Sequence, residues 1–394
     1  MYIPFDTKPI DAVLGKIILG PQLKEPVNVQ DVRAWVQAMH NPNPIHFDEK
    51  AAGRTRFGRI VAPQSFAAAC EHKQGVIAAL EGFLPGAHEL WGGMEWCFAD
   101  KRIQPGDLIR CERVPVDYKV VDTRFAGPTV FQRGDTIFFD QHDKEIARMR
   151  TTAVRYLVDN MRIATEQKSQ DSSSAQQPLT LTEETREQVE LDKQKYYEAV
   201  FDRSEVTPAM PVAGDPLPVG VVGPHSVATF TTEWRAYLCN RGWGATVWDP
   251  DTRDDQMRGF SAEFTPDRTR ARLDPAQMDI VYYGPARGHL DAEFAQRIGM
   301  PRPYGFGVSI GCWVLDYAAN WAGPNADILE AKYRAQGPVF AGEATYLKGK
   351  VLKASTGASG MVEVVVSVQL ESFPTARVVG TGEVKLQFMH NLEK

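Results

Sequence analysis

The feature that most constrains the fold of this chain is an internal repeat. The same order of signals occurs twice: a short Pro/Gly turn carrying a histidine, a helix of unusually small residues, and then three strand-like runs. His289 lies 243 residues after His46 (289 − 46), and Gly342 lies 236 residues after Gly106 (342 − 106). Two offsets that agree within seven residues indicate a duplicated unit whose loops have drifted in length.

Each repeat contains a helix that we expect to be buried on most sides. The first runs from Ser65 to Leu80, is rich in alanine and contains Gly75. The second runs from about Val308 to Trp321 and contains Gly311 and several alanines. Apolar residues nearly all round a helix indicate burial, and small residues let a sheet approach closely. We therefore expect each helix to be wrapped by its own sheet.

The strand-like runs correspond between the halves. Gln104–Ile109 and Val339–Ala344 each place a glycine and an acid before a β-rich run. Asp135–Phe139 and Ile146–Tyr156 are separated by the turn Gln141–Lys144, which predicts a hairpin. Met361–Leu370 and Val378–Phe388, separated by Ser372–Pro374, predict the corresponding hairpin of the second half.

A polar segment divides the repeats. Glu166–Pro178 is serine-rich and has no apolar residue larger than alanine, which is typical of a linker. Leu181–Val200 follows, with alternating acids and bases that indicate a solvated helix. The predicted domains are therefore residues 1–160, a linker and helix over 161–205, and residues 206–394.

Composition excludes several functional classes. The 394 residues carry a net charge of -6, and no Lys/Arg run of the kind that binds nucleic acid is present. Charge and proline near Met1 argue against a signal peptide, and no apolar run is long enough to span a bilayer, so we expect a soluble cytoplasmic protein. Five scattered cysteines without CxxC suggest neither a disulfide framework nor a zinc ribbon; we expect buried cysteines.

The densest polar motif is the turn Asn41–Asp48. It places amides, a histidine and an acid on a proline-stiffened loop, which is costly unless a site needs them there. The competing interpretation is a helix-connecting loop in which Asn and Asp cap backbone groups. A metal site from His40, His46 and Asp48 is not favoured, because the prolines explain the turn without a metal.

This turn resembles the hydratase motif of the MaoC-like hot-dog proteins, which include (R)-specific enoyl-CoA hydratases and the double-hot-dog hydratase 2. In that family an Asp precedes the His by five residues, with Asn-Pro and an aliphatic residue just before the His. Here Asn41 replaces the acid, while Asn43, Pro44, Ile45 and His46 match. The resemblance covers nearly the whole chain outside residues 160–205. It implies an α+β fold of two tandem hot-dog units, each an antiparallel sheet around a long central helix, forming an intrachain pseudo-dimer.

The resemblance also implies a mechanism. A neutral His takes a proton from the water that adds at Cβ, while the acid handles the proton needed at Cα. A backbone N–H from a glycine about eighteen residues after the His polarises the thioester carbonyl. The first half has Val61–Gln64 in that region, and Pro63 has no N–H to give. On this interpretation the first half lacks its usual oxyanion donor.

The second half departs from the motif in the opposite way. Tyr283–Asp291 keeps His289 and Asp291, but Gly284 stands where the acid would be and Ala286 where the Asn would be. Gly307 follows His289 by eighteen residues at the start of the small-residue helix. This half therefore keeps the donor and lacks the acid, and neither half carries the full hydratase set.

These comparisons define the candidate site residues. His46, Asn41, His289 and Gly307 are the catalytic candidates, although His289 also fits a surface network with Arg287, and Gly307 also fits a packing role. Asn41 can orient a water or the substrate but cannot act as acid or base. The candidates for substrate contact fall into three groups: turn residues, arginines facing CoA phosphates, and aromatic residues of an apolar acyl pocket. They are Asn43 and Asp48; Arg54, Arg56 and Arg59; and Tyr304, Phe306, Trp91, Trp96, Trp234, Trp243, Trp248, Trp313 and Trp321. Asp48 also fits a helix cap, the arginines also fit exposed side chains that are only solvated, and the aromatic residues also fit the core.

Three functions are compatible with these residues. The first is an enoyl-CoA hydratase or 3-hydroxyacyl-CoA dehydratase for a bulky, long-chain, aromatic or steroid-derived thioester. The second is a catalytically degenerate acyl-CoA-binding or structural partner of a complete hydratase, which the changes at Asn41 and Pro63 favour. The third, a hot-dog thioesterase, is disfavoured because such enzymes do not need this turn. No cofactor is implied, and the expected assembly is a homodimer or a hetero-oligomer with another hot-dog protein.

Overall fold

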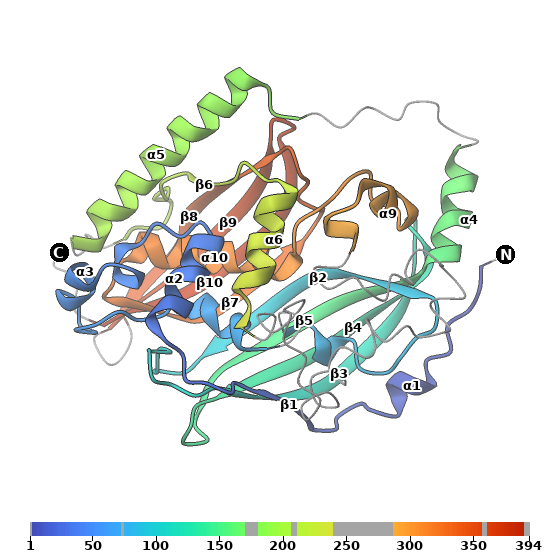
Figure 1. The fold of residues 1–394 in the computed structure, drawn as a ribbon, viewed down its shortest axis with the longest axis horizontal. Helices are drawn as coiled ribbons and strands as arrows, with labels where there is room; N and C mark the ends of the chain where they lie inside the picture. The colour runs from blue at the N-terminus through green and yellow to red at the C-terminus, as the bar shows by residue number, and fades with distance from the viewer. Residues whose placement is uncertain are drawn as a thin grey trace.

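The computed structural model contains one continuous antiparallel sheet (Figure 1). It describes residues 2–71, 75–169, 180–205, 211–238, 287–356 and 361–389. Within these ranges ten strands are hydrogen-bonded in the order β1-β3-β4-β5-β2-β7-β10-β9-β8-β6. They are β1 (Ile18–Gln22), β2 (Ala87–Phe98), β3 (Arg110–Thr123), β4 (Gly127–Phe139), β5 (Glu145–Leu157), β6 (Gly220–Val222), β7 (Ala326–Ala335), β8 (Ala344–Thr356), β9 (Val362–Phe373) and β10 (Arg377–Phe388).

The helices lie mainly on one side of this sheet (Figure 1). Those described are α1 (Lys8–Asp11), α2 (Val29–Ala38), α3 (Glu49–Gly53), α4 (Val158–Ser169), α5 (Glu183–Glu205), α6 (Val227–Ala236), α9 (Ala292–Arg297) and α10 (Gly307–Ala322), with 3-10 helices η1 (Pro44–His46), η2 (Gln64–Cys70), η4 (Ile77–Ala79) and η7 (Arg287–His289). Among the described segments, no helix combines the length and the hydropathy needed to cross a membrane.

The two halves meet edge to edge where β2 pairs with β7. The register runs from Gly93 opposite Arg334 to Cys97 opposite Glu330. A Cβ on Gly93 would lie 2.4 Å from the Tyr333 carbonyl oxygen, and its φ of +152° is one that L side chains rarely adopt. Glycine is therefore required for this close approach. Strands β1–β5 form one half of the sheet and β6–β10 the other, which confirms the predicted pair of tandem hot-dog units in an α+β fold.

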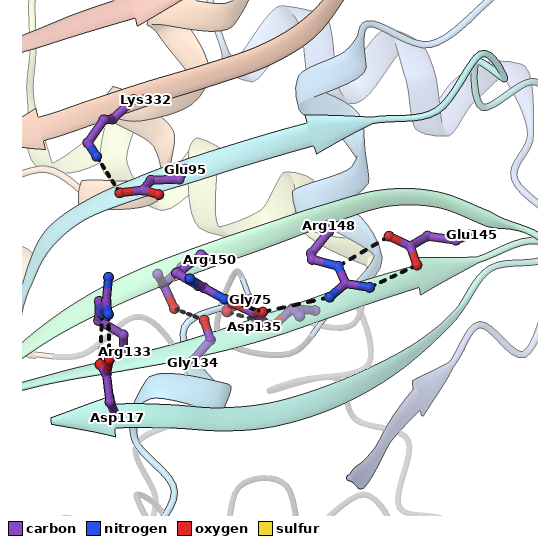
Figure 2. A network of polar contacts seen from close by, with 12 residues as sticks. Gly75, Glu95, Asp117, Arg133, Gly134, Asp135, Glu145, Arg148, Arg150 and Lys332 are labelled. Carbon is purple, nitrogen blue, oxygen red and sulfur yellow. Dashed lines mark hydrogen bonds and ion pairs between the residues drawn. The ribbon is translucent and has the colours of Figure 1, made fainter. Parts of the chain in front are cut away.

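The opposite face of the sheet is covered by ion pairs (Figure 2). On β5, the half-buried Arg148 and Arg150 alternate with the buried Ala147 and Met149. Alternation of this kind separates a core face from a solvated face. Four pairs join neighbouring strands: Arg148–Asp135, Arg150–Asp135, Arg133–Asp117 and Lys332–Glu95. Arg148 also pairs with Glu145 within β5.

The predicted hairpins are present, but one strand of each half was missed. Antiparallel β4 and β5 contain the two runs expected around the turn Gln141–Lys144, and β9 and β10 form the second hairpin. The second turn lies later than expected, because β9 continues through Ser372 and Phe373. Each half has four long strands after its central element instead of three, because β2 and β7 were not recognised.

The central helix was predicted correctly in the second half only. Residues 307–322 form α10, whose residues are almost all buried. In the first half the expected helix Ser65–Leu80 is wrong: the described residues form η2 and η4. Glu71 has extended backbone angles and pairs with Arg113 of β3, and Gly75 has a φ of +81°. A helix cannot pass through these two conformations.

The polar helix after the linker is confirmed and longer than expected. Helix α5 covers Glu183–Glu205 and runs along the second half (Figure 1). Buried Tyr196 of α5 packs beside Tyr317 of α10, so one side of this charged helix is anchored to the core. The first residues of the predicted linker belong to α4, and residues 170–179 lie outside the described part of the chain.

Candidate functional site

The first turn is held by its own amides and by α10. Asn41 Oδ1 accepts hydrogen bonds from Asn43 N (3.1 Å) and from Asn320 Nδ2 (3.1 Å). Asn43 Nδ2 donates to Asn320 Oδ1 (3.1 Å), and Asn43 Oδ1 accepts from Ile45 N (3.3 Å). Asn320 belongs to the second half, so the turn is fastened across the boundary between halves.

His46 is held in one defined tautomer. Its Nδ1 lies 2.6 Å from the Val61 carbonyl oxygen, an acceptor, so Nδ1 carries the proton and Nε2 does not. The residue is only 2% exposed, and burial lowers its pKa to about 3 even though the Val61 bond acts in the opposite direction. His46 is therefore a neutral imidazole near pH 7 whose Nε2 can accept a proton.

Asp48 is a helix cap. Its carboxylate accepts hydrogen bonds from Lys50 N (2.7 Å) and Ala51 N (3.1 Å) at the start of α3. These bonds lower the pKa of this exposed carboxyl. The capping interpretation thus holds for Asp48, and also for Asn43, which caps η1.

The second turn repeats this geometry. His289 Nδ1 lies 2.6 Å from the Tyr304 carbonyl oxygen, fifteen residues later, as Val61 lies fifteen after His46. Burial lowers the pKa of His289 to about 4, and its ring packs on Phe306 with centroids 3.9 Å apart. Asp291 caps α9 through Phe294 N (3.1 Å) and pairs with Arg287. Gly284 and Ala286 lie outside the described residues.

Gly307 begins α10 under an aromatic ring. No side chain caps this helix start, which leaves its first N–H groups without a side-chain partner. A Cβ at Gly307 would lie 2.5 Å from atoms of Trp91, so the glycine has a packing role in addition to any donor role. Tyr304, expected to contact substrate, is buried and provides the carbonyl that binds His289.

The corresponding position of the first half is Gln64, eighteen residues after His46 (64 − 46). Gln64 begins η2 with Pro63 as its N-cap, so the residue at the helix start does have a backbone N–H. The argument that Pro63 removes the donor was therefore wrong. The Gln64 side chain binds Ile328 of β7 twice, through Nε2 to the carbonyl (2.8 Å) and through Oε1 from the N–H (2.7 Å).

Sequence reasoning missed the most unusual group beside the first turn, which is Asp316 of α10. It is 4% exposed; Ser65 Oγ donates to its Oδ1 at 2.6 Å, and Trp35 Nε1 donates to Ser65 Oγ at 3.0 Å. Burial raises the pKa of Asp316 to about 7, although Ser65 and the nearby Asn41 amide act to lower it. A polar face at positions 309, 316 and 320 of an otherwise apolar helix was the available signal.

A second buried carboxyl, Glu233 of α6, was also missed. Burial raises its pKa to about 8, and Ser309 of α10 lies close enough to lower that pKa slightly. Ser309 Oγ is 3.1 Å from the Tyr237 hydroxyl. Glu233 therefore lies beside the first turn of α10, whereas Asn320, which contacts Asn41, is eleven residues further along that helix (320 − 309).

The remaining candidates lie apart from the turns. Arg54, Arg56 and Arg59 are exposed; Arg56 pairs with Asp327 (2.6 Å), and Arg59 donates to the Pro105 carbonyl oxygen (2.7 Å). Most of the tryptophans with described positions are core residues. They include Trp96, Trp234, Trp313, which stacks on His225 (centroids 5.3 Å apart), and Trp321, while Trp243 and Trp248 lie outside the described residues. Among described residues no His/Cys/Asp/Glu group has metal-binding geometry.

Residues 13–149 match the family model described as FAS1-like, dehydratase domain region. This matched range contains the whole first turn. A probable enoyl-CoA hydratase alpha subunit of Thermomonospora curvata is 41% identical over 59 residues, which are 15% of this chain and 18% of that relative. The match thus spans less than a fifth of that relative's length.

Solved structures extend the likeness to nearly the whole chain. A MaoC-like dehydratase superposes with a TM-score of 0.59 at 17% identity, covering 96% of this chain and 99% of the other. The chain has the double hot-dog fold. A Mycobacterium tuberculosis protein described as having a double hotdog fold superposes on this chain with a TM-score of 0.53 at 13% identity, covering 98% of each. A putative MaoC domain dehydratase from Chloroflexus aurantiacus J-10-fl gives 0.54 at 11% identity, covering 95% of each.

Proposed function

We propose that this protein belongs to the MaoC-like hot-dog family and is an enoyl-CoA hydratase or 3-hydroxyacyl-CoA dehydratase whose working site is the first turn. The single observation that carries the proposal is the state of His46. A backbone carbonyl 2.6 Å from Nδ1 and deep burial together keep the imidazole neutral with Nε2 unprotonated. A general base for water addition needs this state.

The first half also has a rigid turn and a helix-start N–H donor, two further parts that this reaction requires. Asn41 and Asn43 hold the turn rigid through Asn320, which fixes the position of the base. We assign the backbone N–H of Gln64, at the start of η2, as the donor that polarises the thioester carbonyl while enolate character develops. The match of residues 13–149 to a dehydratase-region family supports the choice of this half.

The preferred substrate in this proposal is a bulky or long acyl-CoA thioester. Its CoA phosphates would meet the exposed Arg54 and Arg59, which follow the turn. The second half, with His289 and a helix start packed under Trp91, acts in this proposal as the degenerate copy that shapes the acyl site.

The test is hydration of trans-2-enoyl-CoA thioesters from crotonyl to long-chain, aromatic and steroidal, followed as loss of enoyl absorbance. We expect turnover on the bulkier members that is abolished in His46→Ala and retained in His289→Ala. Turnover abolished only by the His289 variant would move the active site to the second half. No turnover on any thioester would contradict the proposal.

The alternative is a degenerate partner subunit that binds acyl-CoA without turning it over. The amide of Asn41 in the position of the family acid favours it, as does the similarity to a protein named an alpha subunit. Binding of enoyl-CoA without turnover, together with activity that appears only on mixing with a second hot-dog protein, would establish this alternative.

A further inference from the structure

The carboxyl group of Asp316 lies beside Asn41, the motif position where the first turn has an amide instead of an acid. Asp316 belongs to the other half of the chain. Asp316 on α10 is near enough to the Asn41 amide for that amide to lower its pKa. Asn320, one turn further along α10, binds both Asn41 and Asn43. The central helix of the second half therefore presents an acid and an amide to the turn of the first.

We propose that Asp316 is the proton-carrying acid of the first-half site and replaces, across the boundary between halves, the carboxyl that Asn41 lacks. This inference rests on the proposed hydratase function. It assigns to a residue outside the motif the role for which Asn41 is chemically unsuited, because an amide neither donates nor accepts a proton in this pH range.

Unsatisfied polar atoms support a role beyond packing. Asp316 Oδ2 and Asn41 Nδ2 are both buried, and the Asn41 amide lies near enough to the Asp316 carboxyl to lower its pKa by hydrogen bonding, yet within the described part of the chain neither atom has a partner in good hydrogen-bond geometry. Two such atoms on neighbouring side chains are destabilising, and native interiors seldom retain them without a use.

The chemistry balances with neutral His46 and protonated Asp316 as the starting state. Water adds through oxygen to Cβ, and one of its protons passes to His46 Nε2. The C=C electron pair moves toward the thioester carbonyl, and the Asp316 O–H proton is then transferred to Cα. The excess proton on His46 returns to the Asp316 carboxylate by way of solvent, so the two residues end in the state in which they began.

The surroundings of Asp316 fit an acid that keeps its proton near neutral pH. The groups that face or influence it are Ser65, which donates to Oδ1, the Asn41 amide, the Arg102 guanidinium, the Cys312 thiol and the Tyr196 hydroxyl. Arg102 is tied to Asp327 at 2.6 Å, which reduces its pull on the Asp316 proton. Protonation of Asp316 is consequently favoured below pH about 7.

The test transfers the carboxyl group from position 316 to position 41 in addition to removing it. Asp316→Asn should lower kcat for enoyl-CoA hydration by about 10²–10³-fold with little change in KM, as expected when a proton-transfer group is lost. The double variant Asn41→Asp with Asp316→Asn exchanges the acid and the amide, and we expect it to recover at least about tenfold of the lost kcat. Recovery of kcat without a matching recovery of the free energy of unfolding separates proton transfer from a structural role, because the exchanged pair also restores the hydrogen bond between positions 41 and 316.

Glu233→Gln provides the matched control, because it neutralises another buried carboxyl with a raised pKa beside α10 and leaves the turn unchanged. Its kcat should stay within about threefold of wild type. The wild-type kcat/KM should fall above pH about 7, and this fall should disappear in Asp316→Asn.

Three results would overturn the assignment. If Asp316→Asn keeps wild-type kcat, Asp316 is not the acid although the enzyme is a hydratase. If the folded double variant is no more active than Asp316→Asn, the contact with Asn41 does not carry the proton-transfer role. If the wild type turns over no thioester, the hydratase proposal itself fails and the role of Asp316 fails with it.

Discussion

The two halves of this chain have the same sheet but different central elements. In the second half, α10 is a continuous helix of 16 residues, whereas in the first half η2 and η4 are short 3-10 segments interrupted at Glu71 and Gly75. The first half keeps the tighter turn, with two asparagines around His46, and α10 supplies Asn320 and Asp316 to it. Two copies of one unit can therefore differ in their central element when one copy contributes side chains to the other across a shared buried boundary.

The histidines give the largest expected contrast between the halves. Removing His46 should lower kcat/KM for enoyl-CoA hydration by about 10²–10⁴-fold, as expected when a general base is lost. Removing His289 should change kcat/KM less than about tenfold, because its half lacks an acid at Gly284. Steady-state kinetics of His46→Ala and His289→Ala measure this directly.

The opposite pattern would reverse the comparison, placing catalysis at His289 and assigning His46 to the fold. Circular dichroism of both variants is the control, since a buried histidine can also be lost through unfolding.

The second contrast is in the pH dependence of stability. The pKa of Asp316 is raised from 3.8 to about 7 in the folded protein, so between these values the unfolded chain loses this proton while the folded protein keeps it. The contribution of protonated Asp316 to the free energy of unfolding therefore declines as pH rises from 4 to 7, by on the order of 2–4 kcal/mol. The difference in stability between wild type and Asp316→Asn, measured by urea unfolding at several pH values, should show this slope.

His46 has the opposite effect on the pH dependence of stability and provides the comparison with Asp316. Its pKa is lowered to about 3, so below pH 6.5 the unfolded chain binds a proton that the folded protein does not, and stability falls as pH decreases. His46→Gln should be less sensitive to acid over this range than wild type. Equal pH slopes in wild type and in both variants would show that neither group is perturbed by burial.

A third experiment compares the two helix starts. Gly307→Ala should destabilise the protein by about 1–3 kcal/mol, because its Cβ would overlap Trp91 of β2 at 2.5 Å. Gly53→Ala in α3 is the control: its Cβ would meet nothing within 4 Å, so we expect a gain of up to about 1 kcal/mol.

At the matching position of the first half, Gln64→Ala should cost about 1–3 kcal/mol by leaving the Ile328 N–H and carbonyl unpaired. Thermal unfolding of the three variants gives these values. A neutral Gly307→Ala would show that Trp91 can move away from α10.

The smallest expected effect concerns the arginines. Arg54 and Arg59 follow His46 by eight and thirteen residues, and Arg297 and Arg302 follow His289 by the same spacings. Arg59→Gln should raise KM for acyl-CoA by about two- to fivefold, since an exposed ion pair is worth at most about 1 kcal/mol. Arg297→Gln, whose guanidinium pairs with Glu293 at 2.6 Å, should leave KM unchanged.

The increase in KM should shrink with added salt if the contact is with phosphate. A larger change in Arg297→Gln than in Arg59→Gln would place the CoA group on the second half.

Much of the fold was predictable because its signals are local and repeated. Alternating runs predicted β5 and β10, and a helix that is apolar on nearly all sides predicted α10. Strand β2 was missed because Gly92 and Gly93 interrupt its alternation, and Gly93 is required by the approach of β7, which is far away in sequence. The helix expected over 65–80 was wrong because a tertiary ion pair, Glu71 with Arg113, overrides local helix propensity.

The candidate site was predictable only in part for the same physical reason. The motif in the first turn is local, so the sequence identifies His46, Asn43 and the helix cap at Asp48. Asp316 and Asn320 reach the turn from 270 or more residues away in the chain, and one sequence contains no signal for that juxtaposition. The raised pKa of Asp316 likewise depends on burial, which follows from packing rather than spacing.

The edge-to-edge pairing of β2 with β7 has a consequence for how the protein is made. Gly93 and Arg334 are neighbours in the sheet but 241 residues apart in the chain (334 − 93). During synthesis the first half therefore emerges with β2 as an uncovered edge strand, which is a template for pairing with the wrong chain. The interval between the synthesis of β2 and that of β7 is on the order of 10–50 seconds at about 5–20 residues per second. Glu95, held by Lys332 once the sheet closes, places a charge on that waiting edge, where charged side chains discourage premature pairing.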